Sequence, residues 1–206
     1  MRITLQQVSK SFGRETVIKD VDRVIDPGSR TAILGPNGSG KSTLLQLIGG
    51  FTIPTKGTVT HELNGKVIEQ ENVYRHISIA APYMSLYEEL SLREAIASHR
   101  RFKPLRGNLA PEEVARIALL EKHLDKPVRD FSSGMKQRLK LALAVLSDTS
   151  LLLLDEPTSN LDANGTLWYT ELMSAHSIGR TLVVASNRQE AEIGMCGAMV
   201  DVEQWK

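Results

Sequence analysis

One octapeptide restricts the fold of this chain more than any other feature. Residues Gly35 to Ser42 read Gly-Pro-Asn-Gly-Ser-Gly-Lys-Ser and match the pattern G-x-x-x-x-G-K-[ST]. A β-like run, 30–34, precedes the octapeptide, and an apolar run typical of a helix, 43–48, follows it. Glycines let a backbone curl until its N–H groups and a helix N-terminus point at one anion. The octapeptide therefore predicts a phosphate-binding loop, in preference to a glycine-rich turn that only caps a helix.

Each residue of this loop has an expected place around a nucleoside triphosphate. The backbone N–H groups would point at the β-phosphate, and Lys41 would reach the β- and γ-phosphates. The hydroxyl of Ser42 would ligate Mg²⁺. The residues that we expect to bind the nucleotide along this stretch are Gly35, Pro36, Asn37, Gly38, Ser39, Gly40, Lys41, Ser42 and Thr43.

Two carboxylates follow a run of four leucines, 151–154, that has the length of a buried strand. Ligands of open α/β sheets bind at the carboxyl ends of the strands, which is where Asp155 and Glu156 stand. We expect Asp155 to hold Mg²⁺, mostly through water, and Glu156 to orient or deprotonate the attacking water. The alternative is a pair of acids that only caps the end of a strand.

Hydrophobic patterns predict an α/β fold. Uninterrupted apolar runs at 151–154 and 181–185, separated by a helical segment, are typical of a parallel sheet covered on both faces. Helices are predicted from Ser91 to about Phe102, from Pro111 to about Leu124, and after residues 132–134. We expect a P-loop NTPase core with a mixed sheet, an N-terminal antiparallel β subdomain and an inserted helical subdomain. The whole chain, 1–206, would be one domain, with its core at 1–81 and 148–206 and its insertion at 82–147.

Charge, cysteine content and the lack of long apolar segments limit the partners and the cellular compartment that we expect for this protein. The 25 basic and 24 acidic residues give a net charge of +1, so we expect no binding to nucleic acid. The single cysteine, Cys196, cannot form an internal disulfide and is predicted to be a small buried residue in a reducing compartment. No signal peptide and no membrane span is apparent, so the protein is expected in the cytoplasm.

Two further stretches complete a pattern. Phe-Ser-Ser-Gly-Met-Lys-Gln-Arg stands at 131–138, and Pro-Thr-Ser-Asn-Leu-Asp stands at 157–162. With the phosphate loop and the two acids, in this order and at this spacing, the chain resembles the ATP-binding cassette (ABC) family over nearly its whole length. The resemblance implies ATP and Mg²⁺ as ligands, and a head-to-tail dimer, homo- or heterodimeric, that holds each ATP between two subunits.

The resemblance also assigns residues outside the loop. Ser132 and Gly134 would complete the ATP site of the partner subunit, and a serine N-cap of the next helix is compatible with that role. Phe12 matches the position of an aromatic ring that stacks on adenine, although a core phenylalanine is the alternative. Asp162 matches a loop that crosses the dimer seam, and it could instead cap a helix.

Two positions depart from the family pattern. Pro82 stands where the family carries a glutamine that contacts Mg²⁺, and proline offers neither a side-chain oxygen nor an N–H group. Asn187 stands where the family carries a histidine that contacts the γ-phosphate, and asparagine cannot become cationic or shuttle a proton near neutral pH. None of the five histidines is an obvious substitute. We therefore expect Lys41, Glu156 and Asn187 to form the catalytic set, with retained but slow hydrolysis.

The resulting functional hypothesis is an ATPase subunit of an ABC transporter that powers a separate integral membrane subunit. Such a protein would lie at the inner face of the cell membrane, on its cytoplasmic side. Residues 86–90 fall in the region where transporter-type members receive a helix of the membrane subunit, and a plain surface loop is the alternative there. A nucleotide-dependent ABC clamp or regulator without transport remains a second hypothesis. A small-molecule kinase would leave 131–138 and 157–162 without a role.

Overall fold

The computed structural model describes residues 1–206 and divides into two compact units. The first unit comprises 1–77, 149–156 and 179–206, and the second comprises 78–148 and 157–178. The sequence-based division assigned 157–178 to the core instead of the helical part. The reason for this difference is that helix α5 (Ala163–His176) packs on α4 (Ser133–Leu146) within the second unit. The domain bounds drawn from the sequence therefore stay a prediction.

An antiparallel sheet forms one part of the first unit. Its order is β2-β1-β4-β5, and its strands are β1 (Arg2–Phe12), β2 (Glu15–Ile25), β4 (Lys56–Leu63) and β5 (Lys66–Val67). Asn64 and Gly65 connect β4 to β5 with φ angles of 52° and 75°, which both central residues of a tight hairpin turn require. Asn-Gly is the dipeptide that predicts a two-residue hairpin turn from sequence, and the structure contains that turn.

A parallel sheet forms the other part of the first unit and carries the elements of the site. Its order within the unit is β7-β8-β3-β9. These strands are β3 (Arg30–Leu34), β7 (Leu151–Asp155), β8 (Thr181–Ser186) and β9 (Ala198–Asp201). The short strand β6 (Ile77–Ala80) begins at Ile77, the last residue of the unit's first segment, and its other residues belong to the second unit. All five residues of β7 and all six of β8 are buried, as expected of a parallel sheet covered on both faces. Antiparallel and parallel strands thus form two sheets.

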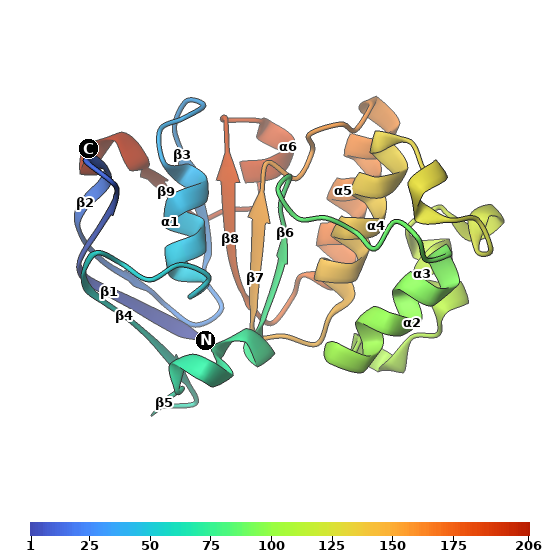
Figure 1. Cartoon of the computed structure of the whole chain (residues 1–206), viewed down its shortest axis with the longest axis horizontal. Coiled ribbons are helices and arrows are strands. Elements are labelled where there is room, and N and C mark those ends of the chain that lie inside the picture. Colours follow the sequence, from blue (N-terminus) through green and yellow to red (C-terminus); the bar gives the residue numbers. More distant parts are fainter. The chain divides into compact units, whose positions relative to one another are not determined.

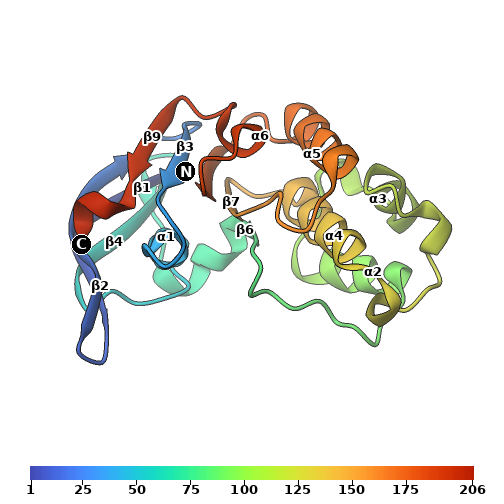
Figure 2. The same ribbon diagram turned by 90° about the horizontal axis from the view of Figure 1, so that it is seen from above.

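Helix α1 (Lys41–Ile48) lies between the two sheets of the first unit (Figures 1 and 2). It contacts β7 and β8 on one side and β1 and β2 on the other. Its buried leucines explain this position, because an apolar helix must bury its surface against the layers beside it. Shorter helices complete the unit: η1 (Gln70–His76), α6 (Glu190–Ile193) and η5 (Val202–Trp205).

The second unit is helical. Its helices are α2 (Leu92–Phe102), η2 (Arg106–Asn108), α3 (Pro111–Ile117), η3 (Glu121–His123), η4 (Val128–Asp130), α4 and α5. Leu92, Leu139 and Leu146 belong to its buried core. The Ser91 hydroxyl and the Glu94 side chain cap α2 reciprocally, which confirms the predicted start of that helix. The side by side packing of α4 and α5 is visible in Figures 1 and 2.

The predicted end of the helix that starts at Pro111 is wrong. Helix α3 ends at Ile117, and Leu119 has a φ of 56°, in the left-handed region that ends a helix. The turn places Leu120 in the core, with 2% of its surface exposed. The apolar pattern of 111–124 therefore continues through a change of chain direction and does not mark one helix.

No helix of the structure combines the length and the apolar character that a membrane crossing requires.

Candidate functional site

The loop 35–42 connects β3 to α1, as the octapeptide predicted. Gly40 is the N-cap of α1 and has a φ of 100°, which side chains rarely tolerate. At Gly35 a Cβ atom would lie 2.5 Å from the Oγ of Ser39, so only glycine fits this close approach. The curled backbone thus depends on two glycines at the two ends of the loop.

A pocket lies over this loop. It is lined by Val17, Asn37, Gly38, Gly40, Lys41, Ser42, Thr43 and Glu156. The N-terminus of α1 opens into it, and unpaired backbone N–H groups at a helix N-terminus attract anions. The pocket therefore has the backbone chemistry that a phosphate chain requires.

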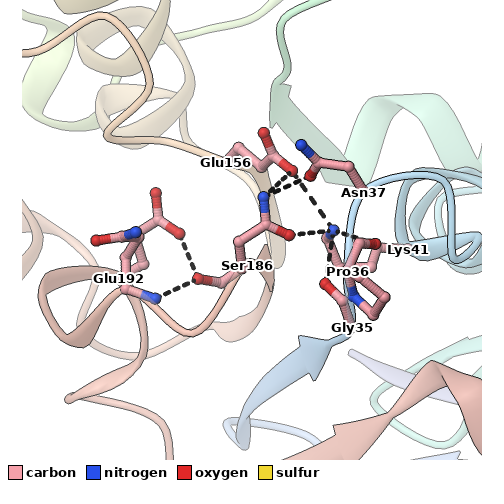
Figure 3. Close-up of polar contacts among 9 residues, drawn as sticks. Gly35, Pro36, Asn37, Lys41, Glu156, Ser186 and Glu192 are labelled. Carbon is pink, nitrogen blue, oxygen red and sulfur yellow. Dashed lines mark hydrogen bonds and ion pairs between the residues drawn. The ribbon is translucent and has the colours of Figure 1, made fainter.

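Lys41 supplies the cation of the pocket. Its side chain is only 4% exposed, and its Nζ donates hydrogen bonds to the carbonyl oxygens of Gly35 (2.9 Å) and Pro36 (3.1 Å). It also donates to Oδ1 of Asn187 at 2.6 Å and lies 3.5 Å from Oε1 of Glu156. The structure therefore brings together the three residues, Lys41, Glu156 and Asn187, that the sequence named as the catalytic set. Figure 3 labels Lys41 and Glu156 and draws the contact between them.

Asn187 links the members of this set. Its Nδ2 donates to Oε1 of Glu156 at 3.1 Å and to the side-chain oxygen of Asn37, while its Oδ1 accepts from Lys41. Strands β7 and β8 pair in parallel with Asp155 opposite Ala185, so the residues that follow both strands meet at one edge of the sheet. A carboxamide can donate and accept at once, which is why one side chain joins a cation to a carboxylate.

Glu156 lies directly after β7 in an uncommon backbone conformation. Its φ is 45°, in the left-handed region, and its N–H group donates to the carbonyl oxygen of Ala185 at 2.9 Å. Such backbone strain persists only where the surrounding structure holds it, and it clusters at functional sites. The conformation places the Glu156 carboxylate on the wall of the pocket.

Asp155 is buried beside the loop, with 2% of its surface exposed. Burial raises the pKa of its carboxyl above the ordinary value, and the nearby Glu156 and Glu192 carboxylates add to that rise. The Ser42 hydroxyl and the Lys41 cation oppose it. Neither carboxylate oxygen has a hydrogen-bond partner, although the Ser42 hydroxyl lies close enough to help lower the pKa. An unsatisfied buried carboxylate beside a hydroxyl fits a hard, oxygen-preferring cation such as Mg²⁺.

Phe12 lies at the end of β1, with 54% of its surface exposed. The Nζ of Lys10 lies 5.0 Å from the centroid of its ring. The alternative of a core phenylalanine is wrong for this structure, because a core side chain would be almost fully buried. Its stacking on adenine stays a prediction.

Ser132 and Gly134 lie in the second unit, at the start of α4. The Ser132 hydroxyl accepts a hydrogen bond from the N–H group of Met135 at 3.2 Å, so the N-cap role is confirmed. A Cβ atom on Gly134 would lie 3.2 Å from the carbonyl oxygen of Asn160, which explains a glycine there. Asp162 caps α5 through the N–H group of Gly165 at 2.7 Å. The capping contacts are compatible with a role of Ser132, Gly134 and Asp162 in a dimer, which stays a prediction.

Three observations near the site were not foreseen from the sequence. The Asn37 side chain contacts Asn187, Val17 lines the pocket, and the buried Ser186 hydroxyl donates to the buried carboxylate of Glu192. A buried glutamate is rare, and nothing in the short segment 190–193 indicates from sequence that Glu192 is buried. Cys196, predicted as buried, is only half-buried beside Ala32, Leu34 and Ile193, and burial raises its thiol pKa to about 11.

Comparison with known proteins decides the family. The family model described as ABC transporter matches residues 18–159, which is more than half of the chain. The chain belongs to the ABC transporter family. This membership agrees with the phosphate loop, the paired acids and the two stretches at 131–138 and 157–162.

Relatives within the ABC transporter family match most of the chain. An ABC transporter ATP-binding protein of Methanosarcina acetivorans is 34% identical over 203 residues, which cover 90% of this chain and 73% of that protein. The Nod factor export ATP-binding protein I of Sinorhizobium fredii is 33% identical over 206 residues, covering 98% of this chain and 60% of that protein. A solved ATP-binding subunit of an ABC transporter is 26% identical with a TM-score of 0.82, covering 98% and 86% of the two chains.

Proposed function

We propose that this chain is the ATP-binding and ATP-hydrolysing subunit of an ABC transporter. The observation that carries the proposal is the contact of Lys41, Glu156 and Asn187 beside the pocket over the phosphate loop. An ABC ATPase of this family hydrolyses ATP to ADP and phosphate, and these are the charges and hydrogen-bonding groups that the reaction requires. Relatives named for export favour an exporter as the assembly in which it acts.

We infer the following division of roles. The backbone N–H groups of the loop bind the phosphates, and Lys41 turns from the carbonyl oxygens of Gly35 and Pro36 to the β- and γ-phosphates. Glu156 accepts a proton from the attacking water, and Asn187 donates to the γ-phosphate. Phe12 stacks on the adenine. Asp155 and Ser42 are the residues that would hold Mg²⁺, and the bound ion would neutralise charge that develops on the phosphates.

The proposal also includes two protein partners. A second ABC ATPase subunit, identical or different, would present Ser132 and Gly134 to the γ-phosphate from the N-terminus of its own α4. An integral membrane subunit would contact the second unit, which would place the chain at the inner face of the membrane. In support, that unit has an apolar groove whose lining includes Met84, Leu86, Tyr87, Phe102 and Leu143.

ATP hydrolysis by purified variants tests the proposal. Glu156→Gln should lose at least about 100-fold in kcat, because it removes the proton acceptor, and should keep ATP binding. Lys41→Ala should lose ATP binding measured by calorimetry, because the phosphates lose their buried cation. Glu69→Gln is the control, since Glu69 is an exposed carboxylate of the same unit. Equal turnover in wild type and Glu156→Gln contradicts the assignment.

A nucleotide-dependent clamp or regulator without transport is the second candidate. It is favoured by Pro82 and Asn187, which replace the glutamine and histidine expected at those positions, and Pro82 contributes only its carbonyl oxygen, which accepts from Lys140 at 3.5 Å. Purification from detergent-solubilised membranes decides between the two. A multi-span membrane protein that co-purifies with the chain supports transport, and a chain that purifies without one supports the clamp.

A further inference from the structure

The turn between β8 and α6 is held at its two ends by buried groups. The hydroxyl of Ser186, the last residue of β8, donates to Oε2 of Glu192 on α6 and accepts from the N–H group of Gln189 at 3.2 Å. Ser186 has no exposed surface, and Glu192 is 2% exposed. Figure 3 shows this pair beside the residues of the phosphate loop. One buried carboxylate therefore joins the end of the strand to the short helix that follows.

The middle of the turn is held as well. Arg188 has a φ of 65°, which a residue other than glycine adopts only when its surroundings favour it. Its guanidinium contacts Oδ2 of Asp201 at 2.7 Å. The turn thus has side-chain contacts on both sides of Asn187, the residue between Ser186 and Arg188: a buried one at Ser186 and an exposed one at Arg188.

The contacts of Asn187 are demanding in geometry. Its carboxamide must keep its oxygen at 2.6 Å from Lys41 and its nitrogen at 3.1 Å from Glu156. Hydrogen bonds weaken steeply outside a narrow range of distance and angle, so a displacement of the turn by about 1 Å breaks one or both. A displacement of this size in an active site can reduce a rate by about 100-fold.

A carboxylate is an expensive group for this place. Burial of a charged side chain is unfavourable unless specific partners compensate it, and an apolar residue would fill the same space at lower cost. We propose that Glu192 is a positioning residue: through Ser186 it fixes the turn that carries Asn187. Asn187 then bridges Lys41 and Glu156 before nucleotide binds and is placed to donate to the γ-phosphate afterwards. This inference rests on the proposed ATPase function and adds to it a residue outside the lining of the pocket over the phosphate loop.

The first test observes Asn187 without nucleotide. In protein labelled with ¹⁵N-asparagine, the side-chain amide signal of Asn187 is assigned from its loss in Asn187→Asp. Glu192→Gln keeps an oxygen that accepts from Ser186, so the signal should stay in place. Glu192→Ala removes the acceptor, so the signal should shift or broaden. An unmoved signal in a folded Glu192→Ala variant overturns the inference.

The second test is a double-mutant cycle on turnover. Glu192→Ala should lower kcat about tenfold in the wild-type background, with rescue by Glu192→Gln, and by no more than about twofold in an Asn187→Ala background. A merely structural role lowers kcat equally in both backgrounds, which overturns the inference. If Glu192→Ala does not fold, Ser186→Ala removes the same hydrogen bond. Wild-type protein without ATPase activity would refute the proposed function, while the amide signal still tests the positioning.

Discussion

At the scale of single residues, the site depends on a few polar groups held out of water. Lys41 and Asp155 are almost fully buried, and Lys41 is compensated by carbonyl oxygens and by Asn187. Buried polar groups with defined partners are geometrically precise, because the alternative of an unsatisfied group is costly. Substitutions of Asn187 and Asp155 test the roles of these polar groups in turnover and in Mg²⁺ binding.

Asn187→His should raise kcat on the order of tenfold. Imidazole can carry a positive charge and shuttle a proton near neutral pH, whereas the carboxamide cannot. Turnover of the variant should also fall when the pH rises through the imidazole pKa, since the cationic form is then lost. Steady-state kinetics over about two pH units around that pKa measures both effects. A kcat below that of wild type at every pH contradicts the explanation for slow hydrolysis.

Asp155→Asn should raise the Mg²⁺ concentration that gives half-maximal ATPase activity by about tenfold or more. The amide keeps the shape of the carboxylate and removes the charge that attracts the cation. Removal of Mg²⁺ with a chelator should abolish turnover of the wild type. Asp26→Asn changes an exposed carboxylate of the same unit and serves as the control. An unchanged Mg²⁺ requirement in Asp155→Asn would exclude Asp155 as a metal-holding residue.

At the scale of elements, helix starts and strand ends carry the functional side chains. The sequence predicted these well where the signals are local: a capping box at Ser91, a hairpin dipeptide at Asn64–Gly65, and apolar runs for β7 and β8. The sequence did not predict the end of α3. The helix stops because Leu119 adopts a left-handed conformation, whereas the apolar pattern of the sequence continues past that point. The start of an element is often marked by local residues such as an N-cap. Its end depends more on tertiary packing and is therefore harder to predict from sequence.

Ser132→Ala separates two roles of one hydroxyl. Loss of the N-cap of α4 should reduce the free energy of unfolding by about 1 kcal/mol, and Ser91→Ala, which removes the N-cap of α2, should cost about the same. Only Ser132→Ala should also weaken ATP-dependent dimerisation. Chemical denaturation and analytical ultracentrifugation measure the two quantities. Equal ATP-dependent dimerisation of Ser132→Ala and Ser91→Ala would show that Ser132 acts only as the N-cap of α4.

His99, on α2, predicts a pH dependence of stability. Burial and then the nearby Lys103 cation lower its pKa to about 4, and its Nε2 lies 2.9 Å from the Ser147 hydroxyl. The unfolded chain binds the proton near pH 6.5, so the stabilising contribution is full above that pH and is lost as the pH falls toward 4. At pH 5 the loss is about 2 kcal/mol. His99→Gln should remove this share of the slope in denaturation experiments, and an unchanged slope would contradict the burial of a neutral imidazole.

At the scale of the whole molecule, the sequence predicted which residues matter better than it predicted how they meet. Lys41 and Asn187 are 146 positions apart, and no spacing rule gives the 2.6 Å contact that the parallel sheet creates between them. The family pattern named both residues. It could not show that Asn187 bridges Lys41 and Glu156, or that Glu192 accepts a hydrogen bond from the neighbouring Ser186. Strands β1 and β2 each extend over 11 residues, although bulges such as the one between Leu5 and Val8 interrupt their alternation of buried and exposed side chains.

The central claim is that ATP is bound by the loop 35–42 and hydrolysed with Glu156. A crystal structure of Glu156→Gln grown with MgATP tests it most directly, because slow hydrolysis preserves the bound nucleotide. The account predicts a triphosphate enclosed by 35–42, with Lys41 moved from Asn187 to the β- and γ-phosphates and with Ser132 of a second subunit at the γ-phosphate. A triphosphate bound away from Lys41 would contradict it.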